Sequence, residues 1–236
     1  TDALAKNQNG SRNIAIGQRS LSSMKYGARN IGIGTFPLAR LVEGDRNIAI
    51  GSDAAWYIQK GEDNVAIGKA ALGEVKEESD RNVAIGTNAL GQTNNNSFTD
   101  NVAIGHRSLS GGSSSFAKTK CVAVGASAGI RNNTNCVAIG ANAALYMEGG
   151  GNVAIGMDAM NNYDVDGQNN ICIGHSAKLH SKSVPATIEN SIAIGYNVEV
   201  SDSNQIIIGS SSHAVVEIAG KRIIFNEDGS VTWEQV

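Results

Sequence analysis

Three cysteines and four histidines are the residues from which metal binding or nucleophilic chemistry would start. They are Cys121, Cys136, Cys172, His106, His175, His180 and His213. No Cys-x-x-Cys pair or Cys/His ligand spacing occurs among them, and three thiols cannot all be paired in disulfides. The chain also lacks the P-loop and His-Glu-x-x-His motifs. The sequence therefore predicts no metal, no cofactor and no catalytic residue, and we expect the cysteines to be small buried residues with free thiols.

Binding chemistry is better supported, because aromatic residues stand beside Asn and Asp in segments that connect more regular ones. Aromatic rings pack on the faces of sugars, while amides and carboxylates bond sugar hydroxyls. Loops on a rigid scaffold often carry such sites. The candidate ligand-binding residues are Trp56, Tyr57, Phe98, Phe116, Tyr146, Tyr163 and Asp164. The alternative at each position is that the ring only fixes its own loop to the scaffold.

The scaffold that must position these residues consists of a short sequence phrase that repeats along the chain. The phrase Asn–(Ile/Val)–Ala–(Ile/Val)–Gly recurs, and after two variable residues Ala or Ser follows, often with Leu next. The steps between successive copies are 17 residues at first and 14 to 21 later. The twelve copies end at Gly17, Gly34, Gly51, Gly68, Gly86, Gly105, Gly125, Gly140, Gly156, Gly174, Gly195 and Gly209.

Such a repeat predicts an all-β chain, a parallel β-solenoid of about twelve short coils in residues 1–209. Alternation places Ile and Val on one strand face, and Asn, Ala and Gly on the other. We expect Ile and Val to fill the interior, and the Ala/Ser–Leu phrase to form a second short strand whose Leu closes it. The repeated Asn side chains are expected to form a hydrogen-bonded ladder or to cap a corner.

A face of small alanines is unusual for a sheet that meets water, and it predicts a close contact with other chains. The simplest assembly is a homotrimer around a threefold axis. The predicted interface residues are Ala49, Ala66, Ala84, Ala103 and Ala154. The alternative is that these alanines fill a crowded corner inside one coil.

Asn-Val-Ala-Ile-Gly-x-x-Ala resembles the repeat of YadA-like head domains, the left-handed parallel β-rolls of trimeric autotransporter adhesins, over about residues 1–209. Similar modules occur in bacteriophage tail fibres. The resemblance implies a left-handed roll, an intertwined or tightly packed homotrimer, and attachment to a host-cell surface receptor such as a glycan. Long insertions, three cysteines and the absence of a heptad pattern depart from the family. The C-terminal ending resembles phage tail-fibre sequences more than autotransporter ones, and together with the cysteines it favours a virion tail fibre over a bacterial cell surface.

Residues 210–236 change pattern and predict β-strands with a hairpin at Asp228-Gly229, a cap or connector. Thr1-Asp2-Ala3-Leu4 matches the phrase that follows a repeat glycine, so we expect the chain to be part of a longer array. The net charge of −3 argues against nucleic acid as a partner, and the short apolar runs argue against membrane insertion.

Two other functions remain open. One is a hexapeptide-repeat acyltransferase, which is also a left-handed parallel β-helix. Its pattern needs an aliphatic residue at every sixth position, whereas Ile16-Gly17-x-x-Ser20 fits only one third of a coil. The other is a structural spacer that carries a distant binding tip.

Overall fold

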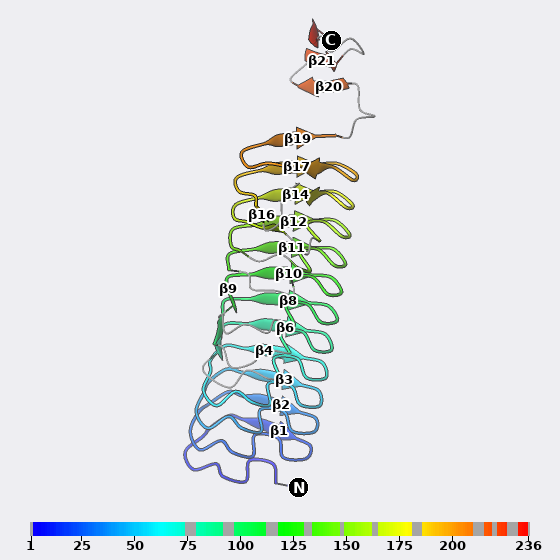
Figure 1. The fold of residues 1–236 in the computed structure, drawn as a ribbon. Helices are drawn as coiled ribbons and strands as arrows, with labels where there is room; N and C mark the ends of the chain where they lie inside the picture. Colours follow the sequence, from blue (N-terminus) through cyan, green and yellow to red (C-terminus); the bar gives the residue numbers. More distant parts are fainter. Residues whose placement is uncertain are drawn as a thin grey trace.

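The computed structural model describes residues 2–73, 79–91, 97–111, 118–129, 134–146, 149–161, 165–180, 186–209, 215–218, 221–225 and 231–235. Over these ranges the chain is all-β, the described residues up to 209 form a parallel β-solenoid, and no helix occurs in any of the ranges (Figure 1). None of this described part supplies a helix that could cross a membrane. The all-β class and the parallel solenoid predicted from the repeat are thus confirmed.

One parallel sheet of twelve strands runs along the solenoid, and each strand is the three-residue centre of one repeat phrase. Neighbouring strands pair in register, so that Ala66 lies beside Ala84 and Ile67 beside Ile85. The strands are β1 (Ile14–Ile16), β2 (Ile31–Ile33), β3 (Ile48–Ile50), β4 (Val65–Ile67), β6 (Val83–Ile85), β8 (Val102–Ile104), β10 (Val122–Val124), β11 (Val137–Ile139), β12 (Val153–Ile155), β14 (Ile171–Ile173), β17 (Ile192–Ile194) and β19 (Ile206–Ile208).

Shorter parallel sheets line other sides of the coils, each strand only two residues long. β5 (Ser79–Asp80), β7 (Phe98–Thr99) and β9 (Lys118–Thr119) form one sheet. β13 (Val165–Asp166) pairs with β16 (Ala186–Thr187), and β15 (Lys178–Leu179) pairs with β18 (Glu199–Val200). Each coil thus contributes very few residues to any sheet, and the stacking of coils supplies the pairing.

The Ala/Ser–Leu phrase closes the interior as expected, but in most coils it is a turn and not a second strand. After the fifth copy of the repeat phrase, Gly86, Asn88 and Leu90 all have positive φ, at 131°, 56° and 49°. A chain with alternate left-handed residues curls back on itself and cannot pair as an extended strand. Leu90 therefore points inward and is fully buried. Among the described residues, only β15 and β18 adopt the expected second strand.

The prediction of which strand face lies inside is wrong. The five alanines assigned to a trimer interface, Ala49, Ala66, Ala84, Ala103 and Ala154, are each 0% exposed within the single chain. Their side chains lie inside the solenoid, as in the alternative that they fill a crowded coil, and cannot touch another chain directly. The Ile and Val residues on either side of them are half-buried or exposed.

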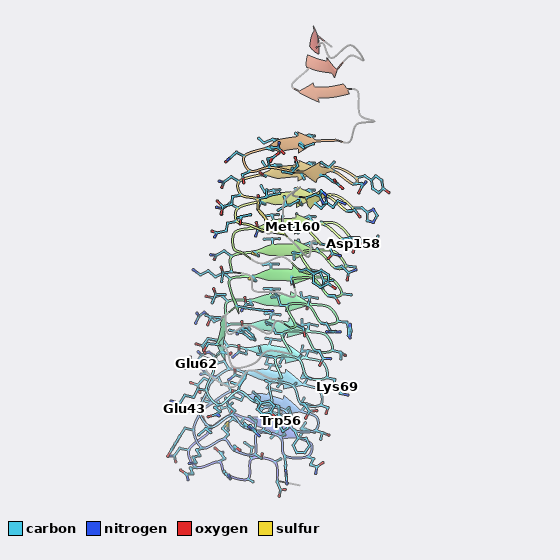
Figure 2. All side chains as sticks on the ribbon, in the orientation of Figure 1. Glu43, Trp56, Glu62, Lys69, Asp158 and Met160 are labelled. Carbon is cyan, nitrogen blue, oxygen red and sulfur yellow. The ribbon has the colours of Figure 1, made fainter. Side chains whose placement is uncertain are left out.

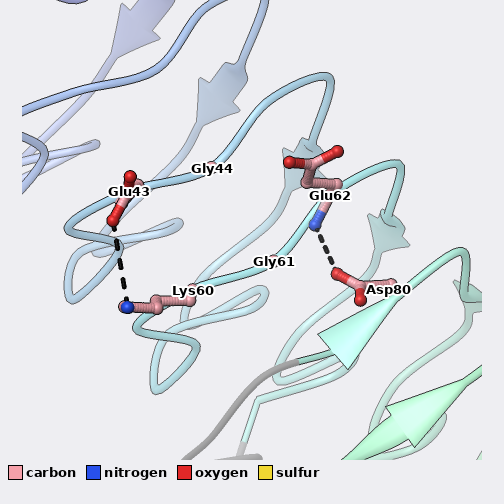
Figure 3. Close-up of a pocket in the computed structure, with 6 residues that line it drawn as sticks. All are labelled: Glu43, Gly44, Lys60, Gly61, Glu62 and Asp80. Atoms are coloured by element: carbon pink, nitrogen blue, oxygen red, sulfur yellow. Dashed lines mark hydrogen bonds and ion pairs between the residues drawn. The ribbon is translucent and has the colours of Figure 1, made fainter.

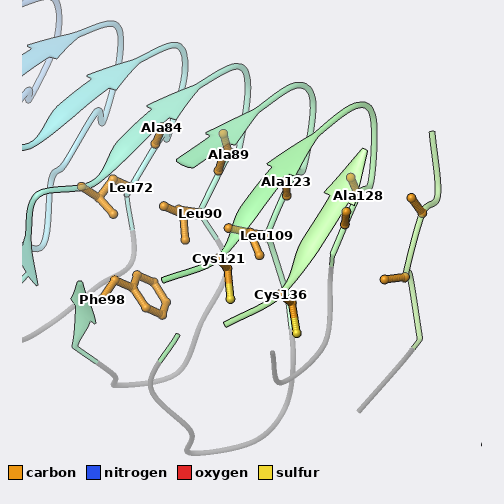
Figure 4. Close-up of a cluster of buried hydrophobic side chains, with 14 of the residues drawn as sticks. Leu72, Ala84, Ala89, Leu90, Phe98, Leu109, Cys121, Ala123, Ala128 and Cys136 are labelled. Atoms are coloured by element: carbon orange, nitrogen blue, oxygen red, sulfur yellow. The ribbon is translucent and has the colours of Figure 1, made fainter. Parts of the chain in front are cut away.

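The limited space inside each coil explains why alanine, and not isoleucine or valine, faces the interior. At Gly32, which takes the alanine position in β2, an added Cβ would lie 2.5 Å from Ser20 Oγ and 3.4 Å from Leu21 Cγ. On the opposite wall, a Cβ at Gly129 would lie 3.1 Å from Leu109 Cδ2 and 3.4 Å from Ala123 Cβ. The interior is therefore filled by the turn residues facing the alanines, and an Ile on the strand would overfill it. Figure 4 shows this packing for Leu72, Leu90 and Leu109 beside the alanines.

The repeated asparagines form the ladder that the sequence predicts. Asn82 Nδ2 donates to Asn64 Oδ1 (3.0 Å), and Asn101 Nδ2 donates to Asn82 Oδ1 (2.9 Å). The same amides also reach sideways across the coil, as in Asn82 Nδ2 to the Phe98 carbonyl (2.7 Å). The interior asparagines are at most 2% exposed. Each amide thus links neighbouring coils and satisfies a backbone carbonyl that faces the interior.

The C-terminal strands form an antiparallel sheet in the order β20 (Val215–Ile218), β21 (Lys221–Phe225) and β22 (Val231–Gln235). The pairing of β21 with β22 matches the predicted hairpin, whose Asp228-Gly229 turn lies outside the described residues. The division of the chain into residues 1–209 and 210–236 stays a prediction.

Candidate functional site

The solenoid register gathers aromatic and arginine side chains from three successive coils into one cluster. Arg19 and Phe36 occupy the same slot of neighbouring coils, since both lie two residues after a repeat glycine. Arg40 and Tyr57 likewise share the slot six residues after the glycine, and Trp56 precedes Tyr57. We call these residues, Arg19, Phe36, Arg40, Trp56 and Tyr57, the aromatic–arginine cluster. It lies in the N-terminal part of the solenoid, where Figure 2 labels Trp56.

Three rings form the centre of the cluster, with a guanidinium at each end. The ring centroids of Phe36 and Trp56 are 6.1 Å apart, and those of Trp56 and Tyr57 are 4.5 Å apart, with tilts of 40° and 46°. The guanidinium of Arg40 lies 4.3 Å from the centre of the Tyr57 ring and 5.4 Å from that of Trp56. Arg19 lies 5.7 Å from the Phe36 ring centre. Such cation–π contacts fix the orientation of a guanidinium without neutralising it.

The cluster is held by the backbone of the turns that carry it. The Arg40 amide donates to the Trp56 carbonyl (3.2 Å), and the Trp56 amide donates to the Asp53 carbonyl (3.3 Å). Beneath it, Leu38, Leu41 and Ile58 are fully buried. The rings themselves are half-buried and Arg40 is exposed. The arrangement combines a preformed apolar surface with a fixed cation, which suits a ligand with an apolar face and a negative charge.

Of the predicted ligand-binding residues that the structure describes, only Trp56 and Tyr57 are brought together. Phe98 is wrong as a ligand contact, because its ring is 0% exposed and packs among Leu and Cys side chains in the core (Figure 4). Tyr146 is half-buried and lies apart in sequence from the cluster. Phe116, Tyr163 and Asp164 lie outside the described residues.

A second surface of note is the outward side of the twelve-stranded sheet, which we call the outer Ile/Val face. Eight of the eleven large hydrophobic side chains that are exposed in the described part of the chain lie on it. These eight are Ile14 (48%), Ile16 (57%), Ile50 (37%), Ile85 (37%), Ile104 (38%), Ile139 (39%), Ile206 (67%) and Ile208 (55%). Contiguous apolar surface of this kind usually marks an interaction site.

The cysteines are buried and free, as expected. Cys121 and Cys136 replace asparagine in neighbouring rungs of the ladder and lie side by side in Figure 4. A hydrogen bond between the two thiols lowers the pKa of Cys121 and raises that of Cys136, so the pair retains a proton. Burial raises the pKa of Cys172 to about 12.

Lys118 is a buried cation that the sequence pattern does not predict. It is 2% exposed, and its ammonium donates to the carbonyls of Leu109 (2.6 Å) and Gly111 (3.1 Å). Burial lowers its pKa to about 7, and the nearby Cys121 thiol acts in the opposite sense. These contacts join strand β9, which begins at Lys118, to the segment 109–111 earlier in the chain, and this role is structural.

An acidic hollow of about 300 Å³ lies along the edge of three coils (Figure 3). Glu43, Glu62 and Asp80 line it together with Lys60. The Lys60 ammonium lies 3.9 Å from a Glu43 oxygen, and Asp80 Oδ1 accepts the Glu62 amide at 2.8 Å. Within the described part of the chain no group of three or more acidic, Cys or His side chains is arranged to hold a metal ion. The hollow is therefore a feature of the charged edge and not a metal site.

Comparison with protein-family models and with curated proteins finds no match for this chain. The candidate site must therefore be judged on its own residues. The sequence pointed to Trp56 and Tyr57, but not to Arg19, Phe36 and Arg40. The signal that would have found them is the 17-residue spacing that joins Arg19 to Phe36 and Arg40 to Tyr57.

Proposed function

We propose that this chain is a non-enzymatic, trimeric fibre module that attaches to a cell surface. In this proposal the solenoid is a left-handed roll of twelve coils, and three copies pack through their outer Ile/Val faces. The favoured setting is a virion tail fibre, and the alternative is the head of an autotransporter adhesin on a bacterial surface. The resemblance of the repeat to YadA-like heads supports both settings.

The outer Ile/Val face is the observation that carries the proposal. It runs from β1 to β19 and presents two branched side chains per strand. Burying an exposed Ile contributes on the order of 1.5–3 kcal/mol, so a face of this length favours strong association. A second copy of the same chain is the natural occupant, because its Ile and Val side chains recur at the same coil-to-coil spacing and interlock along the whole length. Three such faces meet around one axis.

The assembly is tested by sedimentation velocity and mass measurement on the full chain. We expect the wild type to be a trimer, and the Ile104→Glu variant to dissociate while keeping its circular dichroism spectrum. His106→Glu is the matched control, because His106 is exposed in the same coil but follows the strand instead of lying on the face. A wild-type monomer at micromolar concentration, or an Ile104→Glu trimer as stable as the control, would contradict the proposal.

Attachment is tested separately by the binding of labelled trimer to bacterial and animal cells. Saturable binding that unlabelled trimer competes away is expected. Absence of binding by an intact trimer would favour the spacer role, and acyl transfer from acetyl-CoA would favour the enzyme.

A further inference from the structure

The geometry points to a ligand for the aromatic–arginine cluster, and we propose that it is an acidic sugar, a pyranose that carries a carboxylate or a sulfate. This inference rests on the proposed function, since it names the kind of surface molecule that the fibre would recognise. In this proposal the sugar ring packs on the aromatic rings, and Arg40 binds the negative group.

Arg40 differs from the arginines that serve the solenoid itself. Arg46 binds Asp63 at 2.5 Å and Glu62 at 2.8 Å, and Arg81 binds Asp100 at 2.6 Å, so their charges are matched between coils. For Arg40, the contacts that the described residues provide are two aromatic rings and one backbone hydrogen bond. A guanidinium held against rings keeps its N–H edges for an acceptor, and a planar carboxylate or a sulfate fits that edge.

The rings supply the second half of the recognition. Because Phe36, Trp56 and Tyr57 are tilted by 40° and 46° and do not stack in parallel, none of them fully covers its neighbour. Half-buried rings on a turn that is fixed by backbone hydrogen bonds lose little entropy when a ligand binds. The C–H face of a pyranose packs on such a surface, as apolar groups do on aromatic rings.

Asp53 adds an acceptor for sugar hydroxyls. It takes the slot of Phe36 one coil further along, and its backbone carbonyl accepts the Trp56 amide. Its carboxylate accepts a hydrogen bond from Ser52 Oγ (2.9 Å), which orients it. The second guanidinium of the cluster, that of Arg19, lies 4.0 Å from an Asp2 oxygen and is thus paired. Arg40, the oriented Asp53 carboxylate and the three rings together suit a molecule that has hydroxyls and a single negative group better than a simple anion.

The cluster is compatible with the proposed trimer. Its five residues lie in turns and in the segments after them, and none belongs to a strand of the twelve-stranded sheet. The outer Ile/Val face therefore does not include them. The cluster would then lie outside the proposed trimer contact, and each copy of the chain would carry one site.

The test is isothermal titration of the full chain with three oligosaccharides of equal length: neutral, uronic-acid-containing and sulfated. We expect at least one acidic form to bind about tenfold or more tightly than the neutral form, which is the effect of one charge-assisted contact. The uronic and sulfated arms show which negative group is preferred. Arg40→Gln should remove the preference for the acidic form, and Trp56→Ala should weaken binding of every form. Arg12→Gln is the matched control, an exposed arginine outside the cluster.

Two outcomes would overturn the inference: equal affinity for neutral and acidic forms, or Arg40→Gln binding as well as Arg12→Gln. Trimer mass and cell binding are measured on the same samples, so this failure can be told from failure of the proposed function. A trimer that adheres to cells but does not prefer acidic sugars would contradict the ligand assignment alone. A monomer that binds the acidic sugar would contradict the fibre proposal and support the site.

Discussion

At the scale of single residues, volume decides where a side chain goes. Ala84 and Ile85 are neighbours in β6, yet Ala84 is fully buried and Ile85 is 37% exposed. Hydrophobicity alone would place the isoleucine inside. The interior of a coil is so narrow that the turn leucines already fill it, and alanine, glycine or cysteine stands beside them in every strand of the sheet except the last, β19, where Ile207 takes that position.

Lys118 allows the energetic cost of burying a charged side chain to be tested. Its pKa is lowered to about 7 in the folded chain, against an ordinary value of about 10.4 in the unfolded chain. Below pH 7 both states are protonated, and the folded state bears the full cost of a buried cation. Between pH 7 and about 10 the unfolded chain binds more protons, so the stability of the wild type relative to a neutral variant should rise with pH.

We therefore expect Lys118→Met to be more stable than the wild type at pH 7, with a difference that shrinks towards pH 10. Urea midpoints across this range measure it. Lys120→Met is the control, because Lys120 is exposed two residues away and should show no such trend. A constant difference across the range would show that burial does not govern the Lys118 ammonium.

At the scale of elements, the asparagine ladder links neighbouring coils and the two walls of each coil, which the three-residue strands cannot do alone. Asn82 accepts hydrogen bonds from the amide and the side chain of Asn101, at 3.2 and 2.9 Å, and donates to Asn64 and to Phe98. Each rung joins the strand to the opposite wall of its coil. The sheet and the short strand β7 are thus held at a fixed separation.

Removing one rung from the middle of the ladder should be costly. Asn82→Ala leaves buried amide and carbonyl groups of Asn101 and Phe98 without partners, and we expect it to lower the free energy of unfolding by about 2–4 kcal/mol. Asn13→Ala should cost less, because Asn13 stands at the start of the ladder and is half-exposed. Equal shifts of the urea midpoint for the two variants would show that the ladder is not a buried network.

At the scale of the whole molecule, stability comes from contacts between successive coils, so a coil is the unit that can be added or removed. Deleting residues 48–64 joins Asn47 to Val65 and preserves the register, the ladder and both faces of the sheet. Deleting residues 48–55 removes about half a coil and joins Asn47 to Trp56, which breaks all three.

We expect the 17-residue deletion, counted from the repeat spacing, to keep a cooperative thermal transition and the β-type circular dichroism spectrum. The shorter deletion should lose both, although it removes fewer residues. Similar melting of the two variants would argue against a register set coil by coil.

The sequence by itself determined the period, the twelve strand positions, the glycines at the turns and the buried leucines, because each depends on a local pattern of residue types. Alternation along Val83-Ala84-Ile85 also separated two faces correctly. Only the tertiary structure decided which face is inside, since that depends on the space left by Leu90 and its neighbours across the coil. Likewise, Trp56 and Tyr57 could be selected as exposed aromatic residues, but their meeting with Phe36 and Arg40 depends on how one coil stacks on the next. Stacking brings together residues that are distant in the chain, and the volume between the walls of a coil is a property of the folded solenoid.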